Sequence, residues 1–179
     1  MESIIGIIPA RGGSKRLPGK NLKLLGGISL LERTIRQARK ALPVSIVSSD
    51  STEIINETLR CGITALLRPP ELATDTATSA AVVNHVIWTF PDFEWFCLLQ
   101  PTSPLRTVDD ILACIDLADQ SGRPVVSVYK GLPNGAVYIH PTLSFKGDFC
   151  ENAVLYEMPE ERSIDIDTLA DFTRAEAFV

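Results

Sequence analysis

Short apolar runs alternate along this chain with segments in which apolar residues recur every three to four positions. Runs of four to eight apolar residues are typical of buried strands, and the longer spacing is typical of helices packed on a sheet. The alternation predicts an α/β fold with a mostly parallel sheet covered by helices on both faces. With no linker or internal repeat in between, we expect one Rossmann-like domain over residues 1–179.

The boundaries of the elements follow from the apolar runs and the capping residues. Strands are predicted at residues 4–9, 44–48, 63–67, 93–99, 124–129, 136–139 and 163–167. Helices are predicted to start at Ser29 with Glu32 in a capping box, at Asp50 with Glu53, near Thr76, at Thr107 with Asp110, and near Thr168. The inner face of the fourth helix is predicted to be Val108, Ile111, Leu112, Ile115 and Ala118.

Composition narrows the possible functions. The chain is 45% hydrophobic and 22% charged with a net charge of −5, which argues against a large nucleic-acid-binding surface. The apolar run at residues 4–8 is too short to span a bilayer and has no basic segment before it, so we expect a cytoplasmic protein without a membrane partner. Four cysteines lie far apart with no CxxC pair, which predicts buried free thiols.

The loop after the first strand, residues 10–25, is rich in cations and glycines. It contains Arg11, Lys15, Arg16 and Lys20 among three glycines. Glycines let backbone N–H groups approach an anion, and cations form charge-assisted bonds to phosphate. Because this loop leaves the carboxyl end of a strand, where ligands of open α/β sheets bind, the pattern favours phosphate binding over a solvated basic turn. It does not match a Walker A loop, because Ser14 stands five residues before Gly19.

Two aspartates near the end of the sequence alternate with apolar residues in Ser163-Ile164-Asp165-Ile166-Asp167. On a strand, Asp165 and Asp167 would share one face about 7 Å apart. Such a pair can hold Mg²⁺, which prefers carboxylate and phosphate oxygens. The alternatives are that Asp167 only caps the next helix, or that the pair is the DxD motif of a glycosyltransferase.

Residues 8–21, Ile-Pro-Ala-Arg-Gly-Gly-Ser-Lys-Arg-Leu-Pro-Gly-Lys-Asn, resemble the nucleotide-binding signature of the acylneuraminate cytidylyltransferases, and the likeness continues through residues 27–31. The resemblance implies a nucleotide-diphospho-sugar transferase type of fold. It also implies that Arg11, Ser14, Lys20 and Asn21 hold the triphosphate and ribose of CTP. A related signature occurs in enzymes that activate the eight-carbon sugar Kdo, so this loop alone does not fix the sugar.

Three further segments are similar to motifs of the same family. Residues 68–79 resemble its cytosine-binding stretch, which implies base contacts from Arg68, Ala77 and Ser79; without the resemblance the segment would indicate an ordinary capped turn. Residues 100–106 resemble the motif whose glutamine, here Gln100, faces the sugar, and Arg106 is carried over with it. The last motif matches residues 163–167 and implies Mg²⁺ on Asp165 and Asp167.

One segment departs from the family. Between Lys130 and Leu132 the family normally has an extended segment with basic residues that bind the sugar carboxylate and with much of the dimer contact, whereas here Gly131 alone bridges the gap. Only Lys130 remains as a candidate sugar-binding cation. Any homodimer is therefore expected to use a different surface. His85 and His140 have no catalytic partner in the sequence and are interpreted as structural.

The resemblance implies a cytidylyltransferase that joins CMP from CTP to a sialic-acid-like nonulosonic acid with Mg²⁺, releasing pyrophosphate. Arg11, Lys20, Asp165 and Asp167 would carry the catalytic charge. The alternatives are a CMP-Kdo type of nucleotidyltransferase, a DxD glycosyltransferase and a non-catalytic CTP-binding relative. The position of the aspartate pair, close to the end of the given sequence, disfavours the glycosyltransferase.

Overall fold

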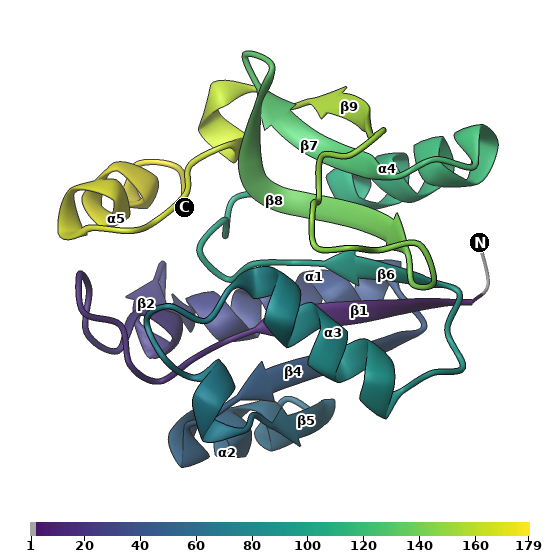
Figure 1. Ribbon diagram of the computed structural model, residues 1–179. Helices are drawn as coiled ribbons and strands as arrows, with labels where there is room; N and C mark the ends of the chain where they lie inside the picture. The colour runs from purple at the N-terminus through teal and green to yellow at the C-terminus, as the bar shows by residue number, and fades with distance from the viewer. Residues whose placement is uncertain (1–2) are drawn as a thin grey trace.

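A computed structural model describes residues 3–179 and shows a twisted seven-stranded sheet with helices on both faces (Figure 1). The strand order is β5-β4-β1-β6-β8-β7-β9. The strands are β1 (Ile4–Pro9), β4 (Val44–Ser49), β5 (Thr64–Leu67), β6 (Trp95–Leu98), β7 (Val125–Tyr129), β8 (Leu132–Pro141) and β9 (Val154–Glu157). All neighbouring pairs are parallel except those of β8, which runs antiparallel to β6 and β7. The predicted α/β class with a mostly parallel sheet is confirmed.

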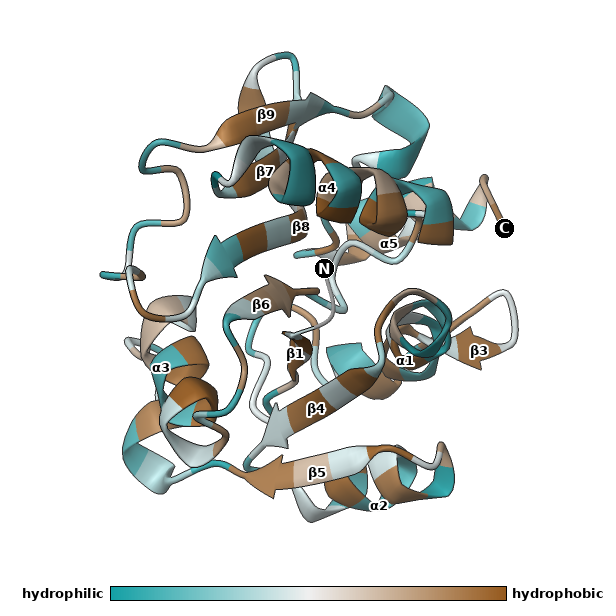
Figure 2. Ribbon diagram, turned by 90° about the vertical axis from the view of Figure 1, so that its right-hand side faces the viewer, coloured by the Kyte–Doolittle hydropathy of each residue, from teal (hydrophilic) through white to brown (hydrophobic). Residues whose placement is uncertain are grey.

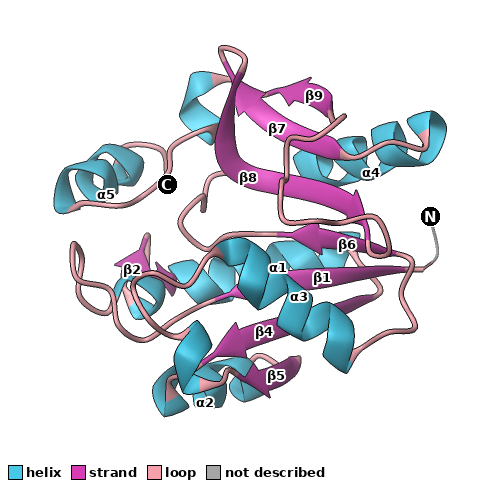
Figure 3. Ribbon diagram, viewed as in Figure 1, coloured by secondary structure: helices cyan, strands magenta, loops and turns pink. Residues whose placement is uncertain are grey.

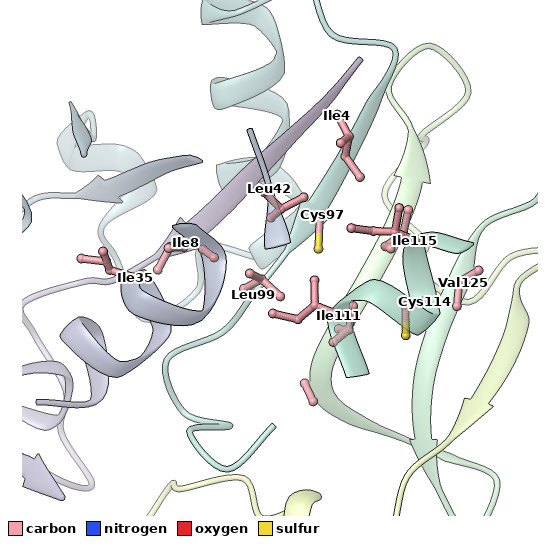
Figure 4. Packing of buried hydrophobic residues seen from close by; sticks show 14 of the residues in the cluster. Ile4, Ile8, Ile35, Leu42, Cys97, Leu99, Ile111, Cys114, Ile115 and Val125 are labelled. Carbon is pink, nitrogen blue, oxygen red and sulfur yellow. The ribbon is translucent and has the colours of Figure 1, made fainter. Parts of the chain in front are cut away.

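Four α-helices cover this sheet: α1 (Leu30–Ala41), α2 (Thr52–Arg60), α3 (Ser79–Thr89) and α4 (Val108–Ser121). A further helix, α5 (Leu169–Glu176), lies beside the sheet and packs on Leu17 and Leu25. Alternate residues of β1 point to opposite faces, so Ile4 and Ile8 pack with α1 and α4, while Ile5 and Ile7 pack with α3. Figure 4 shows the first of these clusters, in which Cys97 and Cys114 fill space among isoleucines and leucines. Polar and apolar residues alternate around α1 and α4 in Figure 2, as expected for helices buried on one side.

Short elements complete the chain and surround the ends of the parallel strands. They are the 3-10 helices η1 (Lys20–Leu22), η2 (Pro70–Leu72) and η3 (Glu160–Arg162), and a small hairpin of β2 (Leu24–Leu25) and β3 (Ile28–Ser29). Figure 3 shows that loops gather at the edge of the sheet where the chain leaves β1 and β6. The loop after β1 and the segment before α5 lie on this same side, where a third apolar cluster joins them through Leu17, Ile164 and Ile166.

The structure corrects the predicted last strand. Residues 163–167 form no strand, because the segment runs past the sheet and only Ile166 N–H pairs with a neighbouring loop, at 2.7 Å from Thr102 O. The predicted alternation survives nonetheless. Ile164 and Ile166 are buried, and the two aspartates face away from them. The strand pattern was therefore produced by an extended loop with one apolar side, while the true last strand, β9, was not predicted.

Four helix predictions also need correction. α2 is capped by Ser51 rather than Asp50, whose carboxylate instead accepts a bond from Gly12 N–H at 2.9 Å. α3 starts at Ser79 after the Thr78 cap, not near Thr76. Ser29 caps α1, but the Glu32 carboxylate binds Arg36 and does not close a capping box. In α4 Leu112, predicted to face inward, is 40% exposed. Because the helix has 3.6 residues per turn, Cys114 follows Ile111 on the buried face instead.

The prediction that the cysteines are buried free thiols is only partly right. All four cysteines are free, and Cys97 and Cys114 are buried, but Cys61 is half-buried and Cys150 is exposed. Burial raises the pKa of Cys97 to about 12, so that thiol is inert at neutral pH. Within residues 3–179 no helix combines the length and apolar character needed to cross a bilayer.

Candidate active site

A cleft of about 610 Å³ opens at the carboxyl ends of β1, β5 and β6, the usual ligand position in an open α/β sheet. Ten of the residues predicted from the sequence line it: Arg11, Ser14, Lys20, Asn21, Arg68, Ala77, Ser79, Gln100, Asp165 and Asp167. They come from four segments that are far apart in the chain. The sheet brings these segments together because each follows or flanks the end of a neighbouring strand.

The basic loop supplies one wall of this cleft. Lys20 is the most buried of its cations, with a side chain only 12% exposed, and its Nζ donates to Ile166 O at 2.9 Å and to Asp167 Oδ1 at 3.0 Å. Asn21 is buried, and its amide donates to Arg11 O at 2.9 Å, which fixes the start of the loop. The loop is thus tied at both ends and presents its cations to the cleft.

A second wall is built around Arg68, which is only 5% exposed. Its guanidinium donates to Ser48 O at 2.8 Å, to Ser48 Oγ at 3.3 Å and to Leu72 O at 3.3 Å. Burial lowers the pKa of Arg68, yet it stays charged at any physiological pH. These bonds use three of the five guanidinium N–H groups, so two remain for a ligand's carbonyl or ring nitrogen.

The floor of the cleft follows β6 and carries Gln100, whose Nε2 lies 3.5 Å from Ser79 Oγ. Arg106, carried over as a sugar-facing residue, does not line the cleft. It is 1% exposed and donates to the backbone oxygens of Gln100, Ser103 and Ala136 at 2.8–3.1 Å. Burial lowers its pKa to about 10, so it remains a cation that holds the turn from beneath. The prediction that Arg106 faces the sugar is wrong, because the backbone oxygens that it bonds lie inside the fold and hold the guanidinium there.

The two aspartates differ in their surroundings. Asp167 accepts from Lys20 and also pairs with Arg16 NH1 at 3.0 Å. Asp165 has no ion pair among those described for residues 3–179; solvent reaches it from the cleft, but the surrounding chain raises its pKa by desolvation, against a hydrogen bond with Thr102 that lowers it. Both carboxylates face the same cleft as the cations.

This pair fits a Mg²⁺ ion of the kind bound through one or two carboxylates and substrate phosphates. No group of three or more His, Cys, Asp or Glu side chains that could hold a metal occurs in residues 3–179. A metal at Asp165 and Asp167 would therefore take its remaining ligands from phosphate and water. That requirement suits a site that also presents phosphate-binding cations.

A smaller cavity of about 350 Å³ adjoins the cleft and shares Gln100 and Asp165 with it. Sequence reasoning missed most of its lining, which is Tyr129, Leu132, Pro133, Asn134, Gly135, Tyr138 and Ser163. For the segment 134–139 the sequence predicts only a strand, at residues 136–139. Its Gly135 is required by geometry: φ is +77°, and a Cβ there would lie 2.9 Å from Gln100 Oε1.

Lys130, the remaining candidate for a sugar-binding cation, does not line the smaller cavity. Lys130 and Gly131 form the two-residue turn between β7 and β8, with φ of +51° and +75°, as a tight hairpin requires. The Lys130 ammonium lies 4.9 Å from the centre of the Tyr129 ring. His85 lines neither cavity, and His140 is buried with its Nε2 2.6 Å from Phe149 O, in keeping with structural roles for both.

The fold is an open α/β sheet, and the cleft at its strand ends gathers five cations beside the carboxylates of Asp165 and Asp167, a lining whose chemistry suits phosphate groups. Residues 5–141 match the family model described as cytidylyltransferase, so the chain belongs to that family. It is 33% identical over 213 aligned positions to the N-acylneuraminate cytidylyltransferase of Escherichia coli O18:K1:H7, covering 96% of this chain and 51% of the relative. It is 39% identical over 132 positions to the CMP-N,N'-diacetyllegionaminic acid synthase of Legionella pneumophila, covering 70% of this chain and 57% of the relative. The predicted resemblance to acylneuraminate cytidylyltransferases is confirmed.

These relatives are longer: the chain spans about half the length of the curated relatives it matches. The alignment with the E. coli protein also runs over more positions than this chain has residues, so that protein has residues with no counterpart here. Among solved structures, the CMP:2-keto-3-deoxy-manno-octonic acid synthetase complexed with CTP superposes with a TM-score of 0.79, 14% identity and 98% coverage of both chains. That likeness shows a shared fold.

Proposed function

We propose that this chain transfers the cytidylyl group of CTP to a sialic-acid-like 2-keto-3-deoxy sugar acid, giving a CMP-sugar and pyrophosphate. The observation that carries the proposal is the convergence, in one cleft, of a cationic loop, a buried arginine and two carboxylates, next to a second cavity that shares Gln100 and Asp165. The names of the E. coli and L. pneumophila relatives support the sugar class.

In this mechanism the anomeric hydroxyl oxygen attacks the α-phosphorus of CTP. An O–P bond forms, the bond from the α-phosphorus to the bridging oxygen of pyrophosphate breaks, and the hydroxyl proton passes to solvent. Arg11 and Lys20 stabilise the charge that develops on the transferring group and on pyrophosphate, because preorganised cations in a cleft act without reorganising solvent. A Mg²⁺ ion bound by Asp165 and Asp167 would supply further electrostatic stabilisation of the phosphates.

Each part of the two substrates can be assigned to a part of the cleft or of the smaller cavity. The triphosphate would lie along Arg11, Ser14 and Lys20, with Asn21 at the ribose. The pyrimidine would lie between Arg68 and the start of α3, where Ala77 and Ser79 line the cleft. The sugar would occupy the smaller cavity with Gln100 at the junction of the two.

The direct test of this proposal is pyrophosphate release from CTP with sialic, legionaminic, pseudaminic and Kdo acids, each with and without Mg²⁺. We expect turnover with one of the nine-carbon acids and none in EDTA. Calorimetry with the four ribonucleoside triphosphates tests the nucleotide side separately, and CTP is expected to bind most tightly. Equal affinity for CTP, UTP, ATP and GTP would refute the cytosine site around Arg68.

A second candidate, a non-catalytic CTP-binding protein, is favoured by one observation. Within residues 3–179 the lining of the smaller cavity contains no lysine, arginine or histidine to pair with a sugar carboxylate. CTP binding without turnover on any of the four acids would support this candidate. Light scattering on the same samples addresses the oligomer, and we expect any homodimer to use a surface other than the short β7–β8 turn.

A further inference from the structure

The four cations of the basic loop are engaged in two pairs, each by one carboxylate. Asp167 holds Arg16 and Lys20, each at 3.0 Å. Asp75 holds the other two, with Arg11 NH1 at 2.8 Å and Lys15 Nζ at 2.5 Å. Asp167 belongs to the carboxylate pair already described. Asp75 lines the same cleft and has been given no role so far.

Asp75 joins two walls of the cleft. It belongs to the segment between η2 and α3, which also carries Ala77 and leads to Ser79, whereas Arg11 and Lys15 belong to the loop after β1. Its side chain is 43% exposed, so the ion pairs are open to competition from solvent and from other anions. Hydrogen bonds from Lys15 and Arg11 hold the pKa of Asp75 below its usual range, so it is charged at neutral pH.

A phosphate group competes directly for the same donors. Arginine binds phosphate and carboxylate oxygens through the same N–H geometry, and lysine binds either as a point charge. A triphosphate carries several negative charges, whereas Asp75 carries one. Arg11 and Lys15 therefore exchange one carboxylate for a more highly charged ligand when the cleft fills.

We propose that Asp75 is a latch. In the free protein it pairs with Arg11 and Lys15 and so joins the segment before α3 to the basic loop. The triphosphate of the nucleotide displaces Asp75 from both cations. This role rests on the proposed function, because it assumes that the basic loop receives the triphosphate. Asp75 then acts as a positioning residue, which keeps both cations ordered before binding and makes weakly charged anions poor competitors for them.

The test measures the binding of inorganic tripolyphosphate and of CTP to the wild type and to Asp75→Asn. Removing the competing carboxylate is expected to tighten tripolyphosphate binding about 2- to 10-fold, the range that one or two exposed ion pairs account for. Asp75→Glu keeps the charge and should return the affinity toward that of the wild type. Asp116→Asn is the matched control, because it removes one exposed charge from α4, which lines no part of the cleft. Unchanged or weaker tripolyphosphate binding by Asp75→Asn would overturn the latch.

Hydrogen exchange supplies a second readout that an ordinary structural ion pair would not give. Without ligand, residues 10–16 and 70–77 should exchange faster in Asp75→Asn than in the wild type. With saturating tripolyphosphate the two proteins should exchange alike, since the latch is then open in both. A difference that persists with ligand bound would mean that Asp75 only braces the fold. If the wild type binds tripolyphosphate but has no preference for CTP, the proposed function fails while the latch is still tested.

Discussion

The larger cleft and the smaller cavity, here called the nucleotide side and the acceptor side, are adjacent but differ in chemistry. Five cations line the nucleotide side: Arg11, Lys15, Arg16, Lys20 and Arg68. The described lining of the acceptor side has none, and its only acid is Asp165, while Glu160 receives a hydrogen bond from Tyr129 at its rim. One half of the site is built for anions, and the other half offers hydroxyls, amides and tyrosine rings.

The difference comes from the elements that build each side. The nucleotide side is formed by loops that follow parallel strands, where long connections leave room for glycines and cations. The acceptor side is formed by the β7–β8 hairpin and the segment before α5. Because a two-residue turn joins β7 to β8, no further chain extends over the cavity to bring a cation to it. The two sides thus differ in charge because different kinds of connection between strands build them.

The largest expected effect comes from the carboxylates at the border of the two sides. Asp165→Asn and Asp167→Asn should each lower turnover at least ~100-fold, because a lost metal ligand removes several kcal/mol of transition-state stabilisation. Only Asp167→Asn should also change the CTP affinity, since Asp167 alone pairs with Lys20 and Arg16. Kinetics and calorimetry measure the two effects, with circular dichroism to verify folding. Near-normal turnover in the double variant would show that the pair is only structural.

The next largest effect concerns the acceptor side, whose described lining has no cationic side chain to pair with a sugar carboxylate. A charge-assisted contact to a carboxylate is worth about 1.5–3 kcal/mol, or roughly 10- to 150-fold in affinity, so we expect a high KM for any sialic-type acid beside normal CTP affinity. Leu132 lines the acceptor side and is 71% exposed, so Leu132→Lys would add the cation without burying it. This variant should lower the KM of the sugar acid and leave that of CTP unchanged, with Leu132→Gln as the uncharged control. A low-micromolar KM in the wild type would contradict this view of the acceptor side.

The nucleotide side could be predicted from the sequence to a much greater extent than the acceptor side. Arg11, Lys20 and Gln100 lie in contiguous motifs after apolar strands, so their residue types and the fold class together placed them at one edge of the sheet. Asp75 was overlooked although it lies within such a motif, because its partners Arg11 and Lys15 are far away in the chain, 64 residues in the case of Arg11. The acceptor side depends on packing between β8, the turn at residue 100 and the segment before α5, and spacing along the chain does not reveal such contacts.

The elements that were misassigned also have physical reasons. The segment 163–167 alternates apolar and polar residues, but a strand needs a neighbour to pair with. Its Ile166 N–H donates to Thr102 O in the loop after β6, and both edges of β6 are already paired with β1 and β8. β9 was missed because its Val154–Glu157 sequence is short and half-exposed, as befits an edge strand. Arg106 was expected to bind ligand only because the family resemblance carried it over, yet it is buried, and four hydrogen bonds from its two terminal nitrogens hold it inside the fold.

A smaller effect on stability and on sugar binding is expected at Gly135, beside the junction of the two sides. Gly135→Ala places a side chain at φ +77° and 2.9 Å from Gln100 Oε1, so both the backbone and the glutamine must shift. A cost of about 1–2 kcal/mol corresponds to a Tm decrease of roughly 2–8 °C in a chain of this size. Since Gln100 lies at the junction, the KM of the sugar acid should rise while CTP affinity stays within about twofold. Thermal unfolding and calorimetry on Gly131→Ala, which also has positive φ but open space around it, separate strain from the Gln100 contact.

The smallest expected effect is a pH dependence of stability that arises in the loop 142–153, which packs behind both sides of the site. The loop 142–153 contacts the start of α3, where Ala80 lies near Gly147, and Phe149 packs on Tyr138 of the acceptor side. Its anchor is His140, whose Nε2–H donates to Phe149 O and whose ring lies among Phe96, Phe145 and Phe149. Asp148 and Glu151 favour the charged ring, but burial outweighs them and lowers the pKa of His140.

A histidine whose pKa is lower in the folded state binds its proton more readily when unfolded, so stability is present above pH 6.5 and is lost as the pH falls from there through the folded pKa. We expect the Tm to fall by a few degrees over that range in the wild type. His140→Gln should remove this component of the pH dependence, because its amide can still donate to Phe149 O but takes up no proton. His85→Gln, which changes the only other histidine, should retain it. If the loop supports the acceptor side more than the nucleotide side, the KM of the sugar acid should rise on acidification before the CTP affinity changes. The reverse order would mean that the loop acts mainly on the nucleotide side, through its contact at Ala80.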